Sequence, residues 1–330
     1  MQRARIRAAA AAGAAIAILA VASPARAQEG PWPARPIRFI VPFPPGGPID
    51  VLSRQIATRL QQALGQPLVV ENVAGAGGGR GLAAIAAAPA NGYTIGLGQT
   101  SNLVFNQHLY PAGSLRYDSV KDFTPIARVV EAANVLCVNP KEPYRSLAEL
   151  VAAGVAKPGT INYGSAGNGA GNHLATELLA SMTGAKFTHV PYKGNAAALT
   201  DLLGGNISFM FNLPIDAVPL AREGKVRALG TTGRTRLQLD SSIPTIGESV
   251  PGFEVVSWAA VIAPAGLPRE ITNRLSDEIA KALRAPEMVE RLTKQGWEIA
   301  YGTPEQAAQT IRNDLVRWGL IVKASGARVD

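Results

Sequence analysis

The stretch IRFIVPFPPGGPIDVLSRQIATRLQQAL, Ile37–Leu64, decides the fold. Its apolar start predicts a short buried strand over Ile37–Val41, and the residues Pro42–Pro48 predict a rigid turn. A helix follows, predicted from apolar residues spaced by three and four: Ile49, Leu52, Ile56, Leu60 and Leu64. Gly46 and Gly47 leave backbone N–H groups open at the start of this helix, where the dipole favours an anion. The alternative is a plain β-α turn whose glycines serve only the backbone.

The N-terminus is typical of a secretory signal. Three arginines precede the apolar run Ala8–Ala22, and Ala25–Ala27 forms a small-x-small cleavage site. The apolar run is too short for a membrane span, and no cysteine lies near the junction to carry a lipid anchor. We therefore expect residues 1–27 to be a signal peptide, cleaved after Ala27, and the mature protein to be periplasmic.

Composition excludes several classes of protein. The formal net charge is +8, but residues 1–27 hold four arginines and no acid, which leaves a surplus of four for the mature chain. That surplus can attract small anions. Lysine and arginine are scattered rather than clustered with aromatic residues, which argues against nucleic-acid binding. The single cysteine, Cys137, lies in the apolar run VLCV and is expected to be a core residue without a disulfide.

Alternating strands and helices predict an α/β fold. After the first strand, turn and helix come a strand over Leu68–Asn72, a glycine-rich loop over Ala74–Gly81 that leads into a helix, and a strand over Tyr93–Gly98. This β-α-β-α-β order predicts a parallel, doubly wound sheet in which ligands bind beyond the carboxyl ends of the strands.

The same plan of strand, polar Gly/Asn loop and helix repeats after Asn139–Pro140. A long strand over Phe253–Gly266 and three amphipathic helices then complete the chain. We therefore predict two lobes, lobe 1 from residues 28–137 and 256–330 and lobe 2 from residues 138–255. The hinge is predicted at the two crossovers, near Asn134–Pro140 and Val255–Ala263.

No local motif indicates catalysis or a cofactor. Tyr163 stands where the first glycine of a G-x-S-x-G elbow around Ser165 belongs, and the three histidines have no metal-ligand spacing. The glycine pairs at 75 and 77 and at 167 and 169 lack the third glycine of a dinucleotide fingerprint. We expect no enzyme activity, no metal and no cofactor.

Loops rich in amides, hydroxyls and glycine remain, and they precede predicted helices in both lobes. Lobe 1 supplies the turn at Gly46 and the segment Thr100–Asn102, and lobe 2 supplies Ser165–Gly169. Backbone N–H and hydroxyl donors of this kind suit capture of a carboxylate without a full counter-charge, and they also let the ligand leave.

Several single residues keep two interpretations. Asp50 is suited to capping its helix or to contacting a ligand amine. His173 is suited either to donating a hydrogen bond to a ligand carboxylate or to bonding with backbone groups at the start of its own helix. Trp258 is suited either to forming a wall of the ligand cleft or to packing in the core of the hinge. Arg80 is either a carboxylate clamp or a solvated loop residue.

These residues resemble the Bug family of periplasmic solute receptors, the extracytoplasmic component of tripartite tricarboxylate transporters. The similarity covers nearly all of the mature chain. Its carriers are WPARPIRFIVPFPPGGPIDVLSR (Trp32–Arg54), GQPLVVENVAGAGG (Gly65–Gly78), NGYTIGLG (Asn91–Gly98), KDFTPIARV (Lys121–Val129), INYGSAGNGAGNHLATELL (Ile161–Leu179), HVPYKGNAAALTDLLGG (His189–Gly205), GKVRALGTTGRTR (Gly224–Arg236), PGFEVVSWAAVIAPAGLP (Pro251–Pro268) and RWGLIVKASGARVD (Arg317–Asp330).

The resemblance implies a type II periplasmic-binding-protein-like fold, with two doubly wound lobes around a ligand cleft. It implies a small organic carboxylate (a di- or tricarboxylate, or an aromatic acid) as ligand and membrane transporter subunits as partners. The ligand-binding residues that it implies are Phe43, Gly46, Gly47, Asp50, Thr100, Ser101, Asn102, Ser165, Gly167, Asn168, Gly169 and His173, with Tyr192 and Trp258 as possible walls.

The chain departs from the family pattern at two positions. Asn212 stands where many relatives carry an aspartate, which disfavours an amino-acid ligand, and Arg80 replaces a smaller residue. We expect a monomeric solute receptor that delivers its ligand to a transporter. The rival interpretations are a ligand-loaded sensor that acts on a signalling partner and an exported hydrolase.

Overall fold

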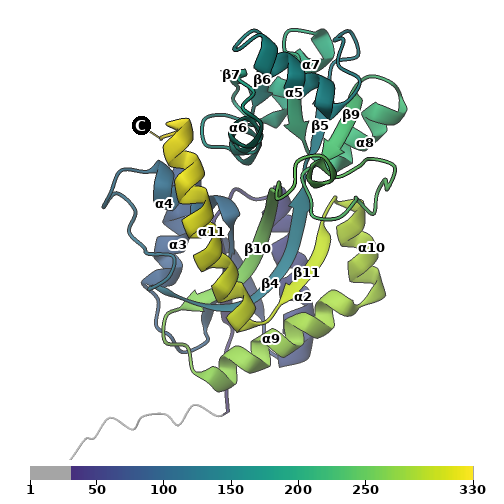
Figure 1. The fold of residues 1–330 in the computed structure, drawn as a ribbon. Helices are drawn as coiled ribbons and strands as arrows, with labels where there is room; N and C mark the ends of the chain where they lie inside the picture. Colours follow the sequence, from purple (N-terminus) through teal and green to yellow (C-terminus); the bar gives the residue numbers. More distant parts are fainter. Residues whose placement is uncertain (1–30, 330) are drawn as a thin grey trace, which may run out of the picture. The chain divides into compact units, whose positions relative to one another are not determined.

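Two β-sheets organise residues 31–329, the part of the chain that the computed structural model describes (Figure 1). The first sheet has the strand order β11-β4-β10-β3-β1-β2, and the second has the order β7-β6-β8-β5-β9. The predicted signal peptide and its cleavage after Ala27 lie outside the described residues. From residue 31 to residue 329, no helix is both long enough and apolar enough to cross a bilayer.

The predicted β-α-β-α-β run is confirmed in the first sheet. β1 (Ile37–Val41) lies between β2 (Leu68–Asn72) and β3 (Thr94–Gln99) and is parallel to both. α2 (Pro48–Leu64) connects β1 to β2 and buries the predicted apolar stripe, and its C-terminus is capped by Gly65 in the left-handed conformation. The carboxyl ends of β1 and β3 therefore lie at one edge of the sheet, as the site prediction requires.

The remainder of this sheet is antiparallel, which corrects the prediction of a parallel sheet. β10 (Val256–Pro264) returns late in the chain and pairs antiparallel with β3 on one side and β4 (Phe123–Ala133) on the other. β11 (Glu298–Gly302), which the sequence did not predict, pairs irregularly with β4 at the sheet edge. Its five residues are mostly half-buried and lack a clear alternation, so pairing with β4 defines the strand.

The second sheet is built from the segment between β4 and β10. Its strands are β5 (Val135–Val138), β6 (Asn162–Ser165), β7 (Thr188–Pro191), β8 (Phe209–Asn212) and β9 (Arg227–Thr231). The chain passes from the first sheet to the second at Asn134. By sheet membership β5 belongs to the second lobe, so we propose a lobe boundary at Asn134 rather than between residues 137 and 138, and keep the boundary at Val255.

Helices fill the connections between the strands. In the first lobe they are η1 (Ala76–Gly78), α3 (Gly79–Ala86), the π-helical turn η2 (Ser101–Phe105), α4 (Asn106–Leu109), α9 (Arg269–Arg284), α10 (Pro286–Lys294) and α11 (Pro304–Ser325). In the second they are α5 (Leu147–Ala156), α6 (Gly171–Thr183), α7 (Asn195–Gly204), α8 (Pro214–Arg222) and η3 (Ile246–Glu248).

Apolar packing joins the two sheets. One cluster of buried side chains includes Ile40 and Ile262 of the first sheet as well as Leu136 and Phe209 of the second. α11 closes it from the side: the ring of Trp318 meets Phe105 edge-on at 4.9 Å. Burial of such aromatic side chains supplies much of the stabilisation of a core.

Close backbone packing between β1 and β3 generates a prediction. A Cβ atom on Gly96 would lie 2.6 Å from the carbonyl oxygen of Ile40, which cannot move without disturbing the sheet. Gly96→Ala should therefore lower the free energy of unfolding by about 1–3 kcal/mol, measured by urea denaturation. Gly204→Ala, where the nearest atom is 3.6 Å away, is the matched control and should not destabilise the protein. Equal stability of the two variants would contradict this packing.

Candidate functional site

The first-lobe turn Pro42–Pro48 is held by a buried carboxylate, that of Asp50. Asp50 is 3% exposed and accepts hydrogen bonds from the Gly46 N–H (2.9 Å), Arg54 Nε (3.0 Å) and Asn72 Nδ2 (2.8 Å). Burial opposes its charge, but these hydrogen bonds outweigh burial and lower the pKa of Asp50 to about 2. The carboxylate is therefore ionised and its acceptor sites are filled from within the lobe.

Because of this arrangement, the glycines of the turn offer fewer free N–H groups to a ligand than the sequence predicted. The N–H of Gly46 is occupied by Asp50, and Gly46 has a φ of +81°, a conformation that favours glycine. The first backbone bond of α2 runs from Val51 N–H to the oxygen of Gly47. The N–H groups of Ile49 and Asp50 therefore have no partner inside the helix and remain as donors at its start.

The segment Thr100–Asn102 begins a helical turn. More of its polar groups are hydrogen-bonded within the protein than the sequence predicted. The Thr100 hydroxyl is 1% exposed, accepts from Trp258 N–H at 2.9 Å and donates to Trp258 O at 3.3 Å. Ser101 is half-buried and accepts from Gln99 Nε2. Asn102 accepts from Gln99 N–H through Oδ1 (2.9 Å). Its Nδ2 is buried and has no hydrogen-bond partner among the described residues.

The space around Asn102 brings two predicted segments together. A Cβ atom on Gly78 would lie 2.6 Å from Asn102 Nδ2 and 3.3 Å from the ring of Phe43. Gly78 therefore lets the glycine-rich segment approach both side chains. Arg80 is exposed, and its side chain runs over Gly75 instead of pointing at this group.

The second-lobe loop Ser165–Gly169 is held at both ends by histidine side chains. Ser165 has no exposed surface, and its Oγ lies 2.6 Å from His189 Nε2 and accepts the Gly167 N–H at 3.1 Å. At the other end, His173 Nδ1 accepts the Gly169 N–H at 3.0 Å. The N–H groups of Gly167 and Gly169, which we predicted as ligand donors, are therefore occupied within the lobe.

The two histidine rings are stacked on each other. Their centroids are 4.0 Å apart and their planes differ by 8°, with the ring of Tyr163 stacked on His189 at 4.9 Å. Since Nδ1 of His173 accepts a backbone N–H, the proton of the neutral ring sits on Nε2, which faces Glu177 Oε1 at 3.9 Å. Burial lowers the pKa of both histidines to about 4, and for His189 the neighbouring His173 lowers it further.

A chain of asparagine amides runs from this loop to the end of β8. Asn172 accepts the Ala166 N–H (3.1 Å) and donates to Asn195 Oδ1 (3.0 Å), and Asn195 in turn donates to Asn212 Oδ1. The Oδ1 of Asn212 also accepts the Leu213 N–H at 2.8 Å, which fixes the orientation of the amide. Its Nδ2 is left buried without a partner among the described residues.

The two aromatic residues proposed as cleft walls have structural partners. Tyr192 is half-buried and donates its hydroxyl hydrogen to Asp201 Oδ2 at 2.6 Å. Trp258 is 2% exposed and donates Nε1–H to Asp314 Oδ2 at 2.6 Å, which ties β10 to α11. For Trp258 these contacts favour the hinge-core interpretation.

The second-lobe loop meets the first lobe directly. A Cβ atom on Gly169 would lie 2.5 Å from Leu109 Cδ1, and one on Gly171 would lie 3.7 Å from Ser257 Oγ. Gly169 is buried and Asn168 beside it is exposed. The loop therefore meets the first lobe through van der Waals contact at Leu109 and Ser257.

Sequence reasoning missed His189, Asn195 and the role of Asn172. His189 lies on β7, opposite Tyr163 in the parallel pairing with β6. Its distance from Ser165 along the chain hides this contact. For the asparagines a signal was available, because asparagine at strand ends and helix starts commonly satisfies loop amides.

Comparisons with known proteins agree with this architecture. The family model described as tripartite tricarboxylate transporter family receptor matches residues 52–327. Protein BugT of Bordetella pertussis is 38% identical over 312 residues, covering 94% of each chain. Among solved structures, R. palustris Rpa4515 with adipate is 34% identical with a TM-score of 0.75, covering 91% of this chain and all of that one. MatC from Rhodopseudomonas palustris with bound malate is 31% identical with a TM-score of 0.70, covering 88% and 100%.

The stacked histidines predict how stability depends on pH. Their pKa of about 4 lies below the value near 6.5 of an unfolded histidine. The unfolded chain therefore binds more protons between pH 6.5 and pH 4, and stability should fall as the pH drops through that window. His189→Gln should make the slope of unfolding free energy against pH shallower, by up to about one proton, measured by urea denaturation from pH 7 to pH 4.5.

Ser165→Ala is the control for this experiment, because it removes the hydroxyl partner and keeps both imidazoles. It should retain the wild-type slope. A slope that stays unchanged in His189→Gln would show that His189 does not titrate in this window.

Proposed function

The chain belongs to the tripartite tricarboxylate transporter receptor family, and we propose that it captures a small dicarboxylate in the periplasm and delivers it to the membrane subunits of such a transporter. Two relatives of solved structure support this ligand class, because one was solved with adipate and the other with bound malate, and both are dicarboxylates. We propose that the receptor acts as a monomer, without a cofactor.

The observation that carries this proposal is the pair of buried amide donors, Asn102 Nδ2 in the first lobe and Asn212 Nδ2 in the second. A buried N–H without an acceptor is costly, so a ligand oxygen that fills it gains affinity. Both Oδ1 atoms already accept backbone N–H groups, which leaves donors rather than acceptors toward a guest. Donors suit a carboxylate and disfavour an amine.

The helix starts add further neutral donors. The first backbone bond of α6 runs from Leu174 N–H to Ala170 O, so the N–H groups of Gly171, Asn172 and His173 have no partner inside the helix. Together with the start of α2, they offer N–H groups and positive dipole ends to an anion. None of the proposed contact residues is a lysine or arginine, so binding relies on neutral groups that also permit release.

We assign no catalytic role to the Ser165–His189 pair. The distance of 2.6 Å between Oγ and Nε2 suits a nucleophile and its base. The Oγ of Ser165, however, accepts the Gly167 N–H and lies 3.1 Å from the Gly167 oxygen, so the loop itself already occupies the hydroxyl. The pair is better explained as support for the loop, and the sensor alternative differs from transport only in the partner that the loaded lobes contact.

A thermal-shift screen tests the proposed ligand class. The mature protein is unfolded and refolded to remove carried-over ligand, then mixed with adipate, malate, citrate, benzoate and aspartate. A ligand at 100 times its dissociation constant should add about 2.7 kcal/mol of stability. Ser165→Ala should weaken binding of the best dicarboxylate at least tenfold because the loop loses its anchor, and Ser181→Ala, on the exposed face of α6, should not. No stabilisation by any carboxylate would contradict the proposal.

Asn212→Asp tests the donor assignment. The substitution keeps the shape of the side chain, removes the Nδ2 donor and adds a negative charge. We expect dicarboxylate affinity to fall at least tenfold and the preference for aspartate over succinate to rise, measured by calorimetry. Asn273→Asp, on the exposed surface of α9, is the matched control. Unchanged affinity in Asn212→Asp would show that Asn212 does not contact the ligand.

A further inference from the structure

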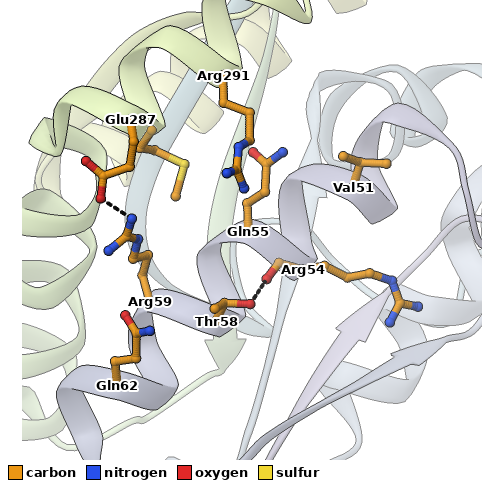
Figure 2. A pocket seen from close by; sticks show the side chains of 9 residues that line it. Val51, Arg54, Gln55, Thr58, Arg59, Gln62, Glu287 and Arg291 are labelled. Carbon is orange, nitrogen blue, oxygen red and sulfur yellow. Dashed lines mark hydrogen bonds and ion pairs between the residues drawn. The ribbon is translucent and has the colours of Figure 1, made fainter.

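A groove of about 450 Å³ lies between α2 and α10, outside the set of residues proposed to contact the ligand (Figure 2). Its lining, which we call the α2/α10 groove, consists of Val51, Arg54, Gln55, Thr58, Arg59 and Gln62 from α2 and Glu287, Met288 and Arg291 from α10. The α2 residues recur every three or four positions, so they form one outward stripe opposite the buried stripe of the helix.

The α2/α10 groove carries a positive surplus. Three arginines line it against the single acid Glu287, which pairs with Arg59. The pKa of Glu287 is lowered chiefly by a backbone hydrogen bond and in part by the charge of Arg291. The guanidinium of Arg291 forms no hydrogen bond with the residues that the structure describes, and Figure 2 shows it pointing toward Gln55. The Oε1 of Gln55 is itself buried without a partner among those residues. The centre of the groove therefore holds a guanidinium whose N–H groups are available to an anionic partner, beside an amide oxygen that can only accept a hydrogen bond.

The rim of the α2/α10 groove is connected to the ligand turn by hydrogen bonds. Arg54 extends away from α10 in Figure 2 and donates to Asp50 Oδ2 (3.0 Å) and Asn72 Oδ1 (3.1 Å). Asp50 accepts the Gly46 N–H, and Asn72 donates to the oxygen of Phe43 at 3.0 Å. Arg54 therefore borders the α2/α10 groove and also stabilises the turn Pro42–Pro48 through Asp50 and Asn72.

We propose that the α2/α10 groove is the docking site for an acidic segment of the transporter's membrane subunit. This inference rests on the proposed delivery function. The positive charge of the groove favours a negatively charged segment. Carboxylates of that segment pair with Arg291 and compete with Glu287 for Arg59. At the rim, a further carboxylate competes with Asp50 for Arg54 and loosens its hold on Gly46.

Docking is therefore coupled to ligand release. A segment that draws Arg54 away from Asp50 weakens the first-lobe turn and lowers the affinity for the dicarboxylate. Thermodynamic linkage requires the reciprocal effect, so the ligand lowers the affinity for the segment by the same factor. This coupling would release the ligand at the transporter rather than in free solution.

Hexaglutamate is the probe for the docking chemistry, with hexaglutamine as the uncharged control. Calorimetry with the mature protein at low salt should show saturable binding of hexaglutamate alone. Arg59→Gln/Arg291→Gln should weaken it at least tenfold. Arg116→Gln/Arg312→Gln, which removes two exposed arginines outside the groove, should change it less than twofold. Equal losses in the two variants, or no binding to the wild type, would overturn the proposal.

The coupling between docking and ligand release is measured as the change in adipate affinity. Saturating hexaglutamate should weaken adipate binding at least threefold in the wild type, and Arg59→Gln/Arg291→Gln should bind adipate alone with wild-type affinity. In proteoliposomes that contain the transporter's membrane subunits, the same variant should support at least fivefold slower adipate uptake. Wild-type uptake by the variant would overturn the docking site. If the wild type binds no carboxylate, the proposed function fails, while the hexaglutamate titration still tests the groove.

Anionic vesicles separate a lipid surface from a protein segment. Vesicles of phosphatidylglycerol and phosphatidylcholine are mixed with the wild type and with Arg59→Gln/Arg291→Gln and sedimented. We expect no difference between the two proteins. Groove-dependent vesicle binding without hexaglutamate binding would overturn the proposal in favour of a membrane surface.

Discussion

The ionised carboxylate of Asp50 is the interaction on which the first-lobe turn depends. It is nearly fully buried, and a buried charge is stable only when hydrogen bonds replace the water that it loses. Gly46, Arg54 and Asn72 supply those bonds, and each belongs to a different part of the lobe: the turn, the helix α2 and the strand β2. Because one carboxylate joins all three, the turn cannot change shape without disturbing the first two turns of α2.

The second lobe fixes its loop with neutral groups instead. Two stacked imidazoles hold Ser165 and Gly169, and a row of asparagine amides holds Ala166. A neutral imidazole can accept a hydrogen bond from the loop, whereas a protonated His173 would lose its acceptor for the Gly169 N–H. The low pKa of both rings, caused chiefly by burial, keeps this loop intact at neutral pH.

The sequence predicted correctly those elements that depend only on neighbouring residues along the chain. The apolar run Ile37–Val41, the stripe of α2 and the strand Leu68–Asn72 were predicted with the observed bounds or within one residue, because hydrophobic period and turn residues define them. The strand β11 was missed since pairing with β4 determines it. The mixed sheet was missed for the same reason, because the late return of β10 is a tertiary event.

In the candidate site too, local features could be predicted from the sequence and tertiary contacts could not. Composition and position predicted both loops as a binding site, which stays a prediction, but glycine N–H groups that the sequence suggested were open are occupied in the fold, as at Gly46, Gly167 and Gly169. The contact between Ser165 and His189 depends on the pairing of β6 with β7, and no spacing in the sequence reveals it.

The two lobes therefore respond to different influences. The first-lobe turn is held by a charge network whose outermost member, Arg54, borders an exposed cationic groove, so a charged partner outside can reach it. The second-lobe loop is held by neutral groups, of which His173 and Asn172 are buried and His189 is half-buried, and it packs against Leu109 of the first lobe. The docking that we propose would therefore act on one lobe: a partner in the α2/α10 groove would loosen the first-lobe turn and leave the second-lobe loop unchanged. If donors from both lobes hold the ligand, as we propose, weakening the first-lobe turn is enough to lower the affinity for the ligand.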